Sequence, residues 1–159
     1  MKKYILLFSL FVITLSSCQK SDVTAEQATI DDAKIQAYIK ANKLTLTKDP
    51  SGFYYQIQIL GTPDLTKTST PNPIATSTVK VSFTNSYING VAFDHVSNVS
   101  YKLSDATTIK AFQLAVTKIS NGGRIYFITP SALAYGSTTQ YTVPANSILI
   151  YTIDLIGFN

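Results

Sequence analysis

The sequence predicts an α+β fold in which an antiparallel, twisted β-sheet wraps over one short α-helix, with a helical extension before it. Residues 79–84 alternate apolar and polar side chains, and residues 149–155 place apolar side chains at every second position, as half-buried strands do. Residues 109–119, between these segments, place apolar side chains at helical spacing instead. A sheet packed on one helix buries both apolar surfaces.

Length and composition bound the class of protein. The chain has 159 residues, enough for one compact domain, and only 14% of them are charged. The net charge is +4, but the first 17 residues hold two of the 13 basic residues and no acidic one, so without them it is +2. This charge does not indicate a nucleic-acid partner. One cysteine and one histidine indicate neither an internal disulfide nor a metal cluster, and no motif implies a cofactor.

Residues 1–17 have the pattern of a secretory signal peptide. Two lysines precede an apolar run that is too short to span a membrane, and small residues follow it. The end of this segment, "LSSC", resembles the bacterial lipobox, which implies that Cys18 is acylated and becomes the first mature residue. A signal peptide with a chance cysteine is the alternative.

Residues 18–24 are polar and are interpreted as a lipid-anchored tether. Within them, Gln19, Lys20 and Asp22 are similar to a short signal that surface lipoproteins of the Bacteroidota carry after the cysteine. The resemblance implies a lipid-anchored protein of the cell envelope, at the periplasmic or the surface face of the outer membrane.

A helix is predicted over residues 25–41, within an N-terminal extension of residues 25–48, because apolar side chains recur on one face of this segment. The adjacent Asp31 and Asp32 are interpreted as part of a solvated face, since neighbouring helical side chains diverge and no metal ligand accompanies them. Whether this helix pairs with a second copy or packs on its own domain is left open, and so is the oligomeric state.

The main domain is predicted to span residues 49–159. The turn sequence Asp49–Gly52 separates two short strands, the second over residues 53–60. Residues 61–78 are rich in Pro, Thr and Ser, but we interpret them as a long internal loop. The apolar strand before them needs a sheet to pair with, and the next strands come after this segment.

The second half of the domain has sharper signals. The dipeptide Asn89-Gly90 predicts a tight hairpin, because both residues tolerate a positive φ. The helix within residues 109–119 is expected to start at a capping serine or aspartate and to end at Gly122-Gly123. A strand is expected over residues 124–129, and the last strand carries Leu149, Tyr151, Ile153 and Leu155 on one face.

Three segments resemble, in order and spacing, the FKBP-type peptidyl-prolyl cis-trans isomerases. They are "VSFTNSYINGVAFDH", "TTIKAFQLAVTKISNGGRIYFITPSALAYG" and "VPANSILIYTIDLI", and the similarity covers residues 79–156. The family has V-x-Y-T-G in its strand, D-G-x-x-F-D in its hairpin and P-x-x-L-A-Y-G in its loop. The resemblance implies an FKBP-like domain preceded by the N-terminal extension of a secreted lipoprotein member.

The resemblance also implies an aromatic pocket. Its catalytic positions would be Phe93, Asp94, Ile109, Phe112 and Tyr135, and its substrate-binding positions Phe83, Val99, Val143 and Tyr151. The chain departs from the family at three of these, because Phe83 replaces a tyrosine, Phe112 a tryptophan and Tyr151 a phenylalanine. For the aromatic residue of the flap, Val99 and Tyr101 are both candidates.

The implied function is rotation about X-Pro bonds in exported polypeptides, that is, a peptidyl-prolyl cis-trans isomerase that assists folding. Its partners would be proline-containing polypeptides and, through the lipid, a membrane. The alternative is an FKBP-like module that binds proteins with little or no turnover. A hydrolase is unsupported, since the single histidine, His95, follows Asp94 directly, and adjacent strand side chains face opposite ways.

Overall fold

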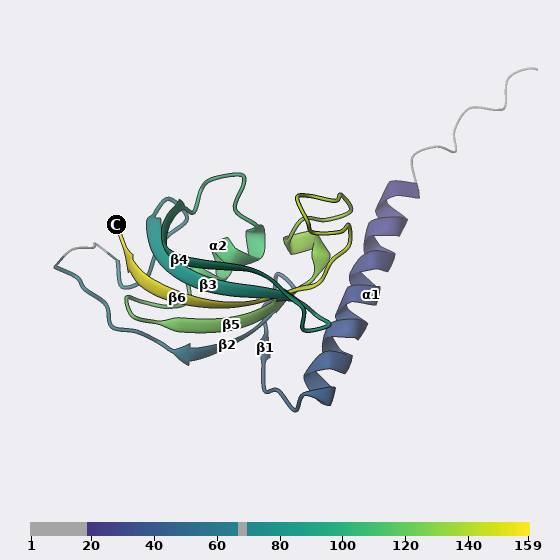
Figure 1. The fold of residues 1–159 in the computed structure, drawn as a ribbon, viewed down its shortest axis with the longest axis horizontal. Helices are drawn as coiled ribbons and strands as arrows, with labels where there is room; N and C mark the ends of the chain where they lie inside the picture. The colour runs from purple at the N-terminus through teal and green to yellow at the C-terminus, as the bar shows by residue number, and fades with distance from the viewer. Residues whose placement is uncertain (1–18, 67–69) are drawn as a thin grey trace, which may run out of the picture.

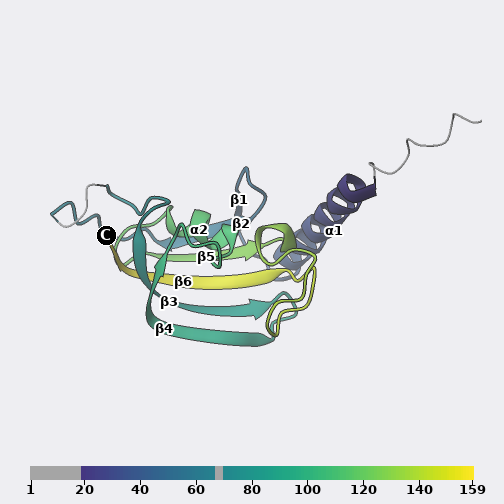
Figure 2. The ribbon, with the colours of Figure 1, turned by 90° about the horizontal axis from the view of Figure 1, so that it is seen from above.

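The computed structural model describes residues 19–66 and 70–159, and it confirms the predicted α+β class (Figure 1). Six strands form one antiparallel sheet in the order β1-β2-β5-β6-β3-β4, and α2 lies against its concave face (Figures 1 and 2). The predicted signal peptide and the lipidation site Cys18 lie outside the described residues.

The strands follow the expected segments closely. Their bounds are β1 Thr47–Lys48, β2 Tyr54–Ile59, β3 Thr78–Tyr87, β4 Ala92–Lys102, β5 Arg124–Thr129 and β6 Leu149–Phe158. The expected hairpin turn joins β3 to β4, with the Gly90 N–H donating to the Tyr87 carbonyl at 2.9 Å and Gly90 at a φ of 85°. A two-residue strand and a turn at Asp49 likewise precede β2, as predicted.

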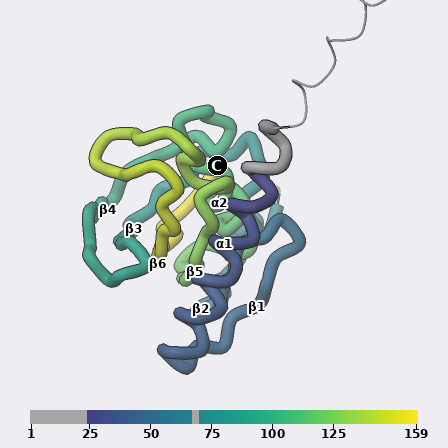
Figure 3. The backbone as a smooth tube through the Cα atoms, turned by 90° about the vertical axis from the view of Figure 1, so that its right-hand side faces the viewer, coloured from purple at the N-terminus to yellow at the C-terminus, as the bar shows by residue number. Residues whose placement is uncertain are grey.

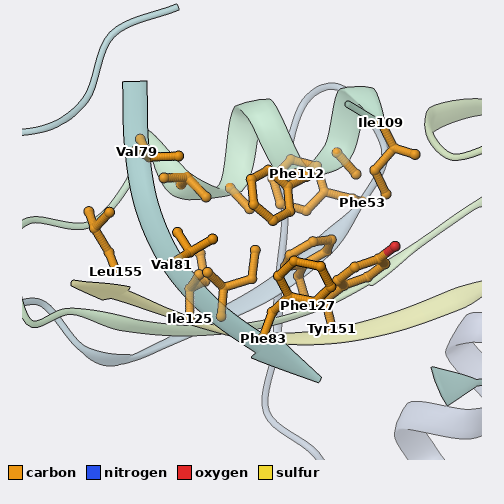
Figure 4. Close-up of a cluster of buried hydrophobic side chains, with 14 of the residues drawn as sticks. Phe53, Val79, Val81, Phe83, Ile109, Phe112, Ile125, Phe127, Tyr151 and Leu155 are labelled. Carbon is orange, nitrogen blue, oxygen red and sulfur yellow. The ribbon is translucent and has the colours of Figure 1, made fainter. Parts of the chain in front are cut away.

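The main hydrophobic core lies between the sheet and α2, which spans Lys110–Val116 (Figure 4). Alternate residues of β3 and β6 point into it, as the period of two predicts. The fully buried side chains of this core include Phe53, Val79, Val81, Ile125, Phe127 and Ile153.

Two expectations about α2 are wrong. Its N-cap is Ile109, which has no side-chain capping bond, because Asp105 instead binds Thr107 in a turn of its own. The helix also ends at Val116, well before Gly122-Gly123, although the buried Ile119 still packs in the core after the last turn. Apolar spacing therefore located the helix but overestimated its length.

The N-terminal helix, α1, spans Gln19–Ala41 and so begins six residues before the predicted start at residue 25. Residues 19–24, interpreted as a tether, are helical. Helix α1 lies across one end of the sheet (Figures 1 and 3). Its Ile35 belongs to a second apolar cluster, which lies on the face of the sheet opposite α2. Within one chain the helix therefore packs on its own domain. Among residues 19–66 and 70–159, no helix is long and apolar enough to cross a membrane.

The segment after β2 is an internal loop, as predicted, and it is held against the end of α2. The Ser120 hydroxyl donates to the Pro71 carbonyl at 2.5 Å, and the Asn72 side-chain amide donates to the Thr117 carbonyl at 3.2 Å. Gly123 lies at the same place, and a Cβ on it would meet the Ile119 Cβ, the Leu60 carbonyl and the Ser120 carbonyl, each at 2.8 Å. A glycine is required there for close backbone approach.

We expect Gly123→Ala to destabilise the fold by about 1 to 3 kcal/mol, because backbone atoms that cannot move aside surround the added methyl group. The matched control is Gly157→Ala, where a Cβ meets nothing within 4 Å. Urea unfolding of both variants measures the difference. Equal midpoints for the two variants would contradict the steric argument.

Candidate functional site

A set of touching aromatic rings occupies one end of the core, and we call it the aromatic cluster. It consists of Phe83, Tyr101, Phe112, Tyr151 and Phe127. Phe83 is central, with ring centroids 5.8 Å from Phe112, 5.8 Å from Tyr151 and 6.0 Å from Tyr101. The ring of Phe127 stacks on Tyr151 at 5.1 Å (Figure 4). Strands β3, β4, β5 and β6 and helix α2 all contribute, so the cluster exists only in the folded chain.

Four predicted site residues, Phe83, Ile109, Phe112 and Tyr151, therefore lie together in the buried core. For the flap position, the structure favours Tyr101 over Val99. The Tyr101 ring also lies 5.9 Å from Phe112, whereas Val99 is 39% exposed and is not among the residues packed on this core. Both residues lie on β4, the edge strand of the sheet, so the ring contacts of Tyr101 rather than the position of the strand distinguish them. Of the two candidates for the flap, the structure places Tyr101 in the aromatic cluster and Val99 outside it.

Phe93 and Asp94 are neighbours on β4, yet both lie toward the cluster. The register of β4 against β3 shifts between Asn85 and Ser86, so that Phe93 has no partner in the ladder. Such a bulge re-aims side chains. Phe93 packs against the core, and its ring lies 4.6 Å from that of Tyr87.

The carboxylate of Asp94 is the acidic group of this region. Its charge helps to raise the pKa values of Tyr101, Tyr135 and Tyr151, in each case after the larger effect of burial. Asp94 lies opposite the buried Asn85 in the β3–β4 register, although Asp94 itself is exposed. The negative charge therefore borders the cluster from the solvent side.

Residues 130–146, between β5 and β6, form a loop that we call the rim loop. It carries Tyr135, half-buried against the core, and Val143, which is buried. The loop has its own hydrogen bonds: the Asn146 N–H donates to the Gly136 carbonyl at 2.8 Å, and a bridge joins Gln140 to Val143. Both predicted rim residues thus lie beside the aromatic cluster.

Two further side chains shape this region. The Tyr87 hydroxyl donates to the Thr142 carbonyl at 2.8 Å and so ties the rim loop to β3. Ile109 precedes the first residue of α2, and the Thr108 carbonyl, which shares a peptide group with the Ile109 N–H, accepts from the Gln113 side-chain amide at 3.0 Å. The N–H groups at a helix start have no partner within the helix, so this is a suitable place for a donor to a ligand carbonyl.

A chain of polar groups crosses the cluster. The buried Asn85 lies opposite Tyr151 in the β3–β6 register. Burial raises the pKa of Tyr151, and a hydrogen bond from Asn85 acts against this rise. Burial likewise raises the pKa of Tyr135, and a hydrogen bond from Tyr151 acts against it. The Tyr151 hydroxyl is therefore close to both the Asn85 side chain and the Tyr135 hydroxyl.

Sequence reasoning missed Asn85, although a signal existed. Residues 79, 81 and 83 are the inward positions of β3, so residue 85 is inward too, and a polar side chain there needs an explanation. Its Oδ1 atom is buried without a hydrogen-bond partner among the described residues, which packing alone does not explain.

The interpretation of Asp31 and Asp32 as a solvated face is wrong. Asp31 is fully buried and accepts hydrogen bonds from Ser131 of the rim loop, while Asp32 accepts from Lys48 and Tyr54 at 2.7 Å each. Because neighbouring side chains of a helix point in different directions, the two carboxylates have different partners. No group of metal ligands occurs in the described ranges, and His95 lies on the exposed strand β4 with its Nε2 3.1 Å from the Ser97 hydroxyl.

We expect Tyr151→Phe to raise the pKa of Tyr135 further, because it removes the hydrogen bond that stabilises the Tyr135 phenolate. Tyr141→Phe is the control with the opposite sign, since the charge of Tyr141 raises that pKa. The NMR titration of labelled tyrosine rings measures both. An unchanged Tyr135 titration in Tyr151→Phe would show that the two hydroxyls do not interact.

Comparison with known proteins agrees with this geometry. A family model described as FKBP-type peptidyl-prolyl cis-trans isomerase matches residues 70–156. The chain is 35% identical over 117 residues to the FKBP-type peptidyl-prolyl cis-trans isomerase FkpA of Buchnera aphidicola, covering 70% of this chain and 42% of that protein. It is 28% identical over 152 residues to a probable FKBP-type peptidyl-prolyl cis-trans isomerase of Haemophilus influenzae, covering 92% of this chain and 59% of that protein.

The crystal structure of FkpA from Escherichia coli matches with a TM-score of 0.69 at 23% identity, covering 87% of this chain and 64% of that one. At this identity the likeness shows the fold. The chain spans about half the length of the two curated relatives above, with shares of 42% and 59%. Since the family model covers more than half of the 159 residues, the chain belongs to the FKBP-type peptidyl-prolyl cis-trans isomerase family.

Proposed function

We propose that this chain catalyses cis-trans isomerisation of X-Pro bonds in polypeptides. The observation that carries the proposal is the convergence, at one end of the core, of the aromatic cluster with the half-buried Tyr135 of the rim loop. The family membership supports the same reaction.

The reaction needs no acid, base or metal. The barrier of about 20 kcal/mol comes from amide resonance, so a catalyst must favour the twisted amide over the planar one. Phe83, Phe112 and Tyr151 would hold the pyrrolidine ring by apolar contact, and a dry surrounding weakens the dipolar resonance form of the amide. The Tyr135 hydroxyl and the Ile109 N–H would orient the neighbouring carbonyls.

The replaced aromatics change how this site is built. Tyr151 places a hydroxyl group inside the aromatic cluster, opposite Asn85 in the β3–β6 register. The absence of a phenol at Phe83 and of an indole at Phe112 leaves a smaller, less polar set of groups. We therefore expect a reduced rate relative to a member with the full aromatic set.

For the wild-type protein, we expect acceleration of cis-trans exchange in a short X-Pro peptide, measured by NMR exchange. Tyr135→Phe deletes one orienting hydrogen bond and should lower catalysis about two- to twelvefold. Phe93→Ala opens the apolar wall to water and should lower it about tenfold or more. The control is Tyr126→Phe, which removes a phenol on the opposite face of the sheet.

The protein-binding alternative predicts a different outcome. A folded wild type would then give no exchange enhancement on any short X-Pro peptide, yet would retain affinity for an unfolded proline-containing polypeptide. Identical, uncatalysed exchange for the wild type and both site variants, with folding verified by circular dichroism, would exclude the enzyme.

We further propose that the protein is a lipoprotein of the cell envelope, of the kind found in the Bacteroidota, and assists folding of exported proteins. The motif "LSSC" supports acylation of Cys18, and helix α1 begins at the next residue, so the anchor would be attached directly to that helix. The similarity of Gln19, Lys20 and Asp22 to a surface signal favours the outer face of the outer membrane.

We expect Cys18→Ala to move the protein out of the membrane fraction or to block its processing, because each buried CH₂ of a lipid contributes about 0.8 kcal/mol to membrane binding. Ser17→Ala keeps a small residue before the cysteine and should change neither property. Cell fractionation and intact mass measure both variants. If Cys18→Ala leaves location and mass as in the wild type, the lipoprotein proposal is wrong.

A further inference from the structure

A buried carboxylate joins the N-terminal helix to the rim loop. The Oδ2 atom of Asp31 accepts the Ser131 backbone N–H at 2.8 Å and the Ser131 hydroxyl at 2.6 Å, across 100 residues of sequence. The Oδ1 atom accepts from the Gln27 side-chain amide at 2.7 Å. Asp31 is 0% exposed and Ser131 is 2% exposed, so water does not compete for these bonds. Figure 1 shows α1 beside the rim loop.

Ser131 in turn holds the residues on both sides of Tyr135. Its carbonyl oxygen accepts the Ala134 N–H at 2.9 Å and the Gly136 N–H at 2.8 Å. The Cα atom of Tyr135, which carries the side chain, lies between these two amides. A path of hydrogen bonds therefore runs from Asp31 through Ser131 to the backbone that sets the place of the Tyr135 hydroxyl.

This contact is not required merely to attach α1 to the domain. The helix is already held by Ile35 in the second apolar cluster and by Asp32, which binds Lys48 and Tyr54 on β1 and β2. Burying a carboxylate is unfavourable unless hydrogen-bond donors are well placed around it. Of the three groups that donate to Asp31, two belong to Ser131 of the rim loop.

We propose that Asp31 is a positioning residue for the isomerase reaction, and that α1 is therefore part of the catalytic unit. This inference rests on the proposed function for its catalytic part. Asp31 touches no substrate. It restricts the motion of the 131–136 turn, so that the Tyr135 hydroxyl stays at one distance from the aromatic cluster instead of sampling several.

The test uses Asp31→Asn, which keeps the side-chain volume but weakens the acceptor, with Asp32→Asn as the matched control on the same helix. We expect Asp31→Asn to lower kcat/KM for an X-Pro peptide about two- to tenfold, mainly through kcat. The loss should not exceed that of Tyr135→Phe, because Asp31 acts only by holding Tyr135 in place. Asp32→Asn should leave kcat/KM unchanged. Ser131→Ala removes the hydroxyl that donates to Asp31 and so weakens the same contact from the rim loop. It should also lower kcat/KM.

A double-mutant cycle separates positioning from general destabilisation. If Asp31 acts through Tyr135, then Tyr135→Phe should lower kcat/KM by a smaller factor in the Asp31→Asn background than in the wild type. In the Asp32→Asn background, Tyr135→Phe should lower kcat/KM by the same factor as in the wild type. Additive effects of Asp31→Asn and Tyr135→Phe, at a temperature where all variants are folded, would overturn the inference.

Hydrogen exchange gives a readout that does not depend on activity. The Ala134 and Gly136 amides should exchange about tenfold faster in Asp31→Asn than in the wild type, while the amides of α2 stay unchanged. Unchanged exchange at these two amides would overturn the inference even if the wild type is active. An inactive wild type with faster exchange at them would instead contradict the proposed function and leave the structural link between α1 and the rim loop standing.

Discussion

The pairing of β3 with both β6 and β4 is the constraint on which the site depends. The β3–β6 register sets Phe83 opposite Ile153 and Asn85 opposite Tyr151. Because side chains alternate between the two faces, a slip of one residue would turn this whole set toward the other face of the sheet. The same strand pairs with β4, whose bulge brings Phe93 and Asp94 to the site.

The rim loop is held from several directions, although it has little regular structure. Tyr87 fixes its far end from β3, and Asp31 fixes its near end from α1. Loops that carry functional residues work best when a rigid scaffold positions them. In this chain the scaffold includes the N-terminal helix, which packs at one end of the sheet on the face opposite α2.

The aromatic replacements in this chain compensate one another in part. Phe83 carries no hydroxyl group, while Tyr151, on the neighbouring strand, brings one into the same cluster. A buried hydroxyl needs a partner, and the buried Asn85 lies opposite Tyr151 in the β3–β6 register. The phenols of the site are thus Tyr101 on β4, Tyr151 on β6 and Tyr135 in the rim loop.

The sequence by itself determined the elements whose signals are local: the alternation of β3 and β6, the turn at Asn89-Gly90 and the motif around Tyr135. These depend on the period of two, on residues that accept a positive φ and on short spacings. Only the tertiary structure decided that Tyr101 rather than Val99 joins the cluster, because the rings that Tyr101 contacts, Phe83 and Phe112, come from β3 and α2. It also decided that Asp31 is buried and binds Ser131. The sequence of a helix indicates which side chains share a face, but not which distant loop contacts that face.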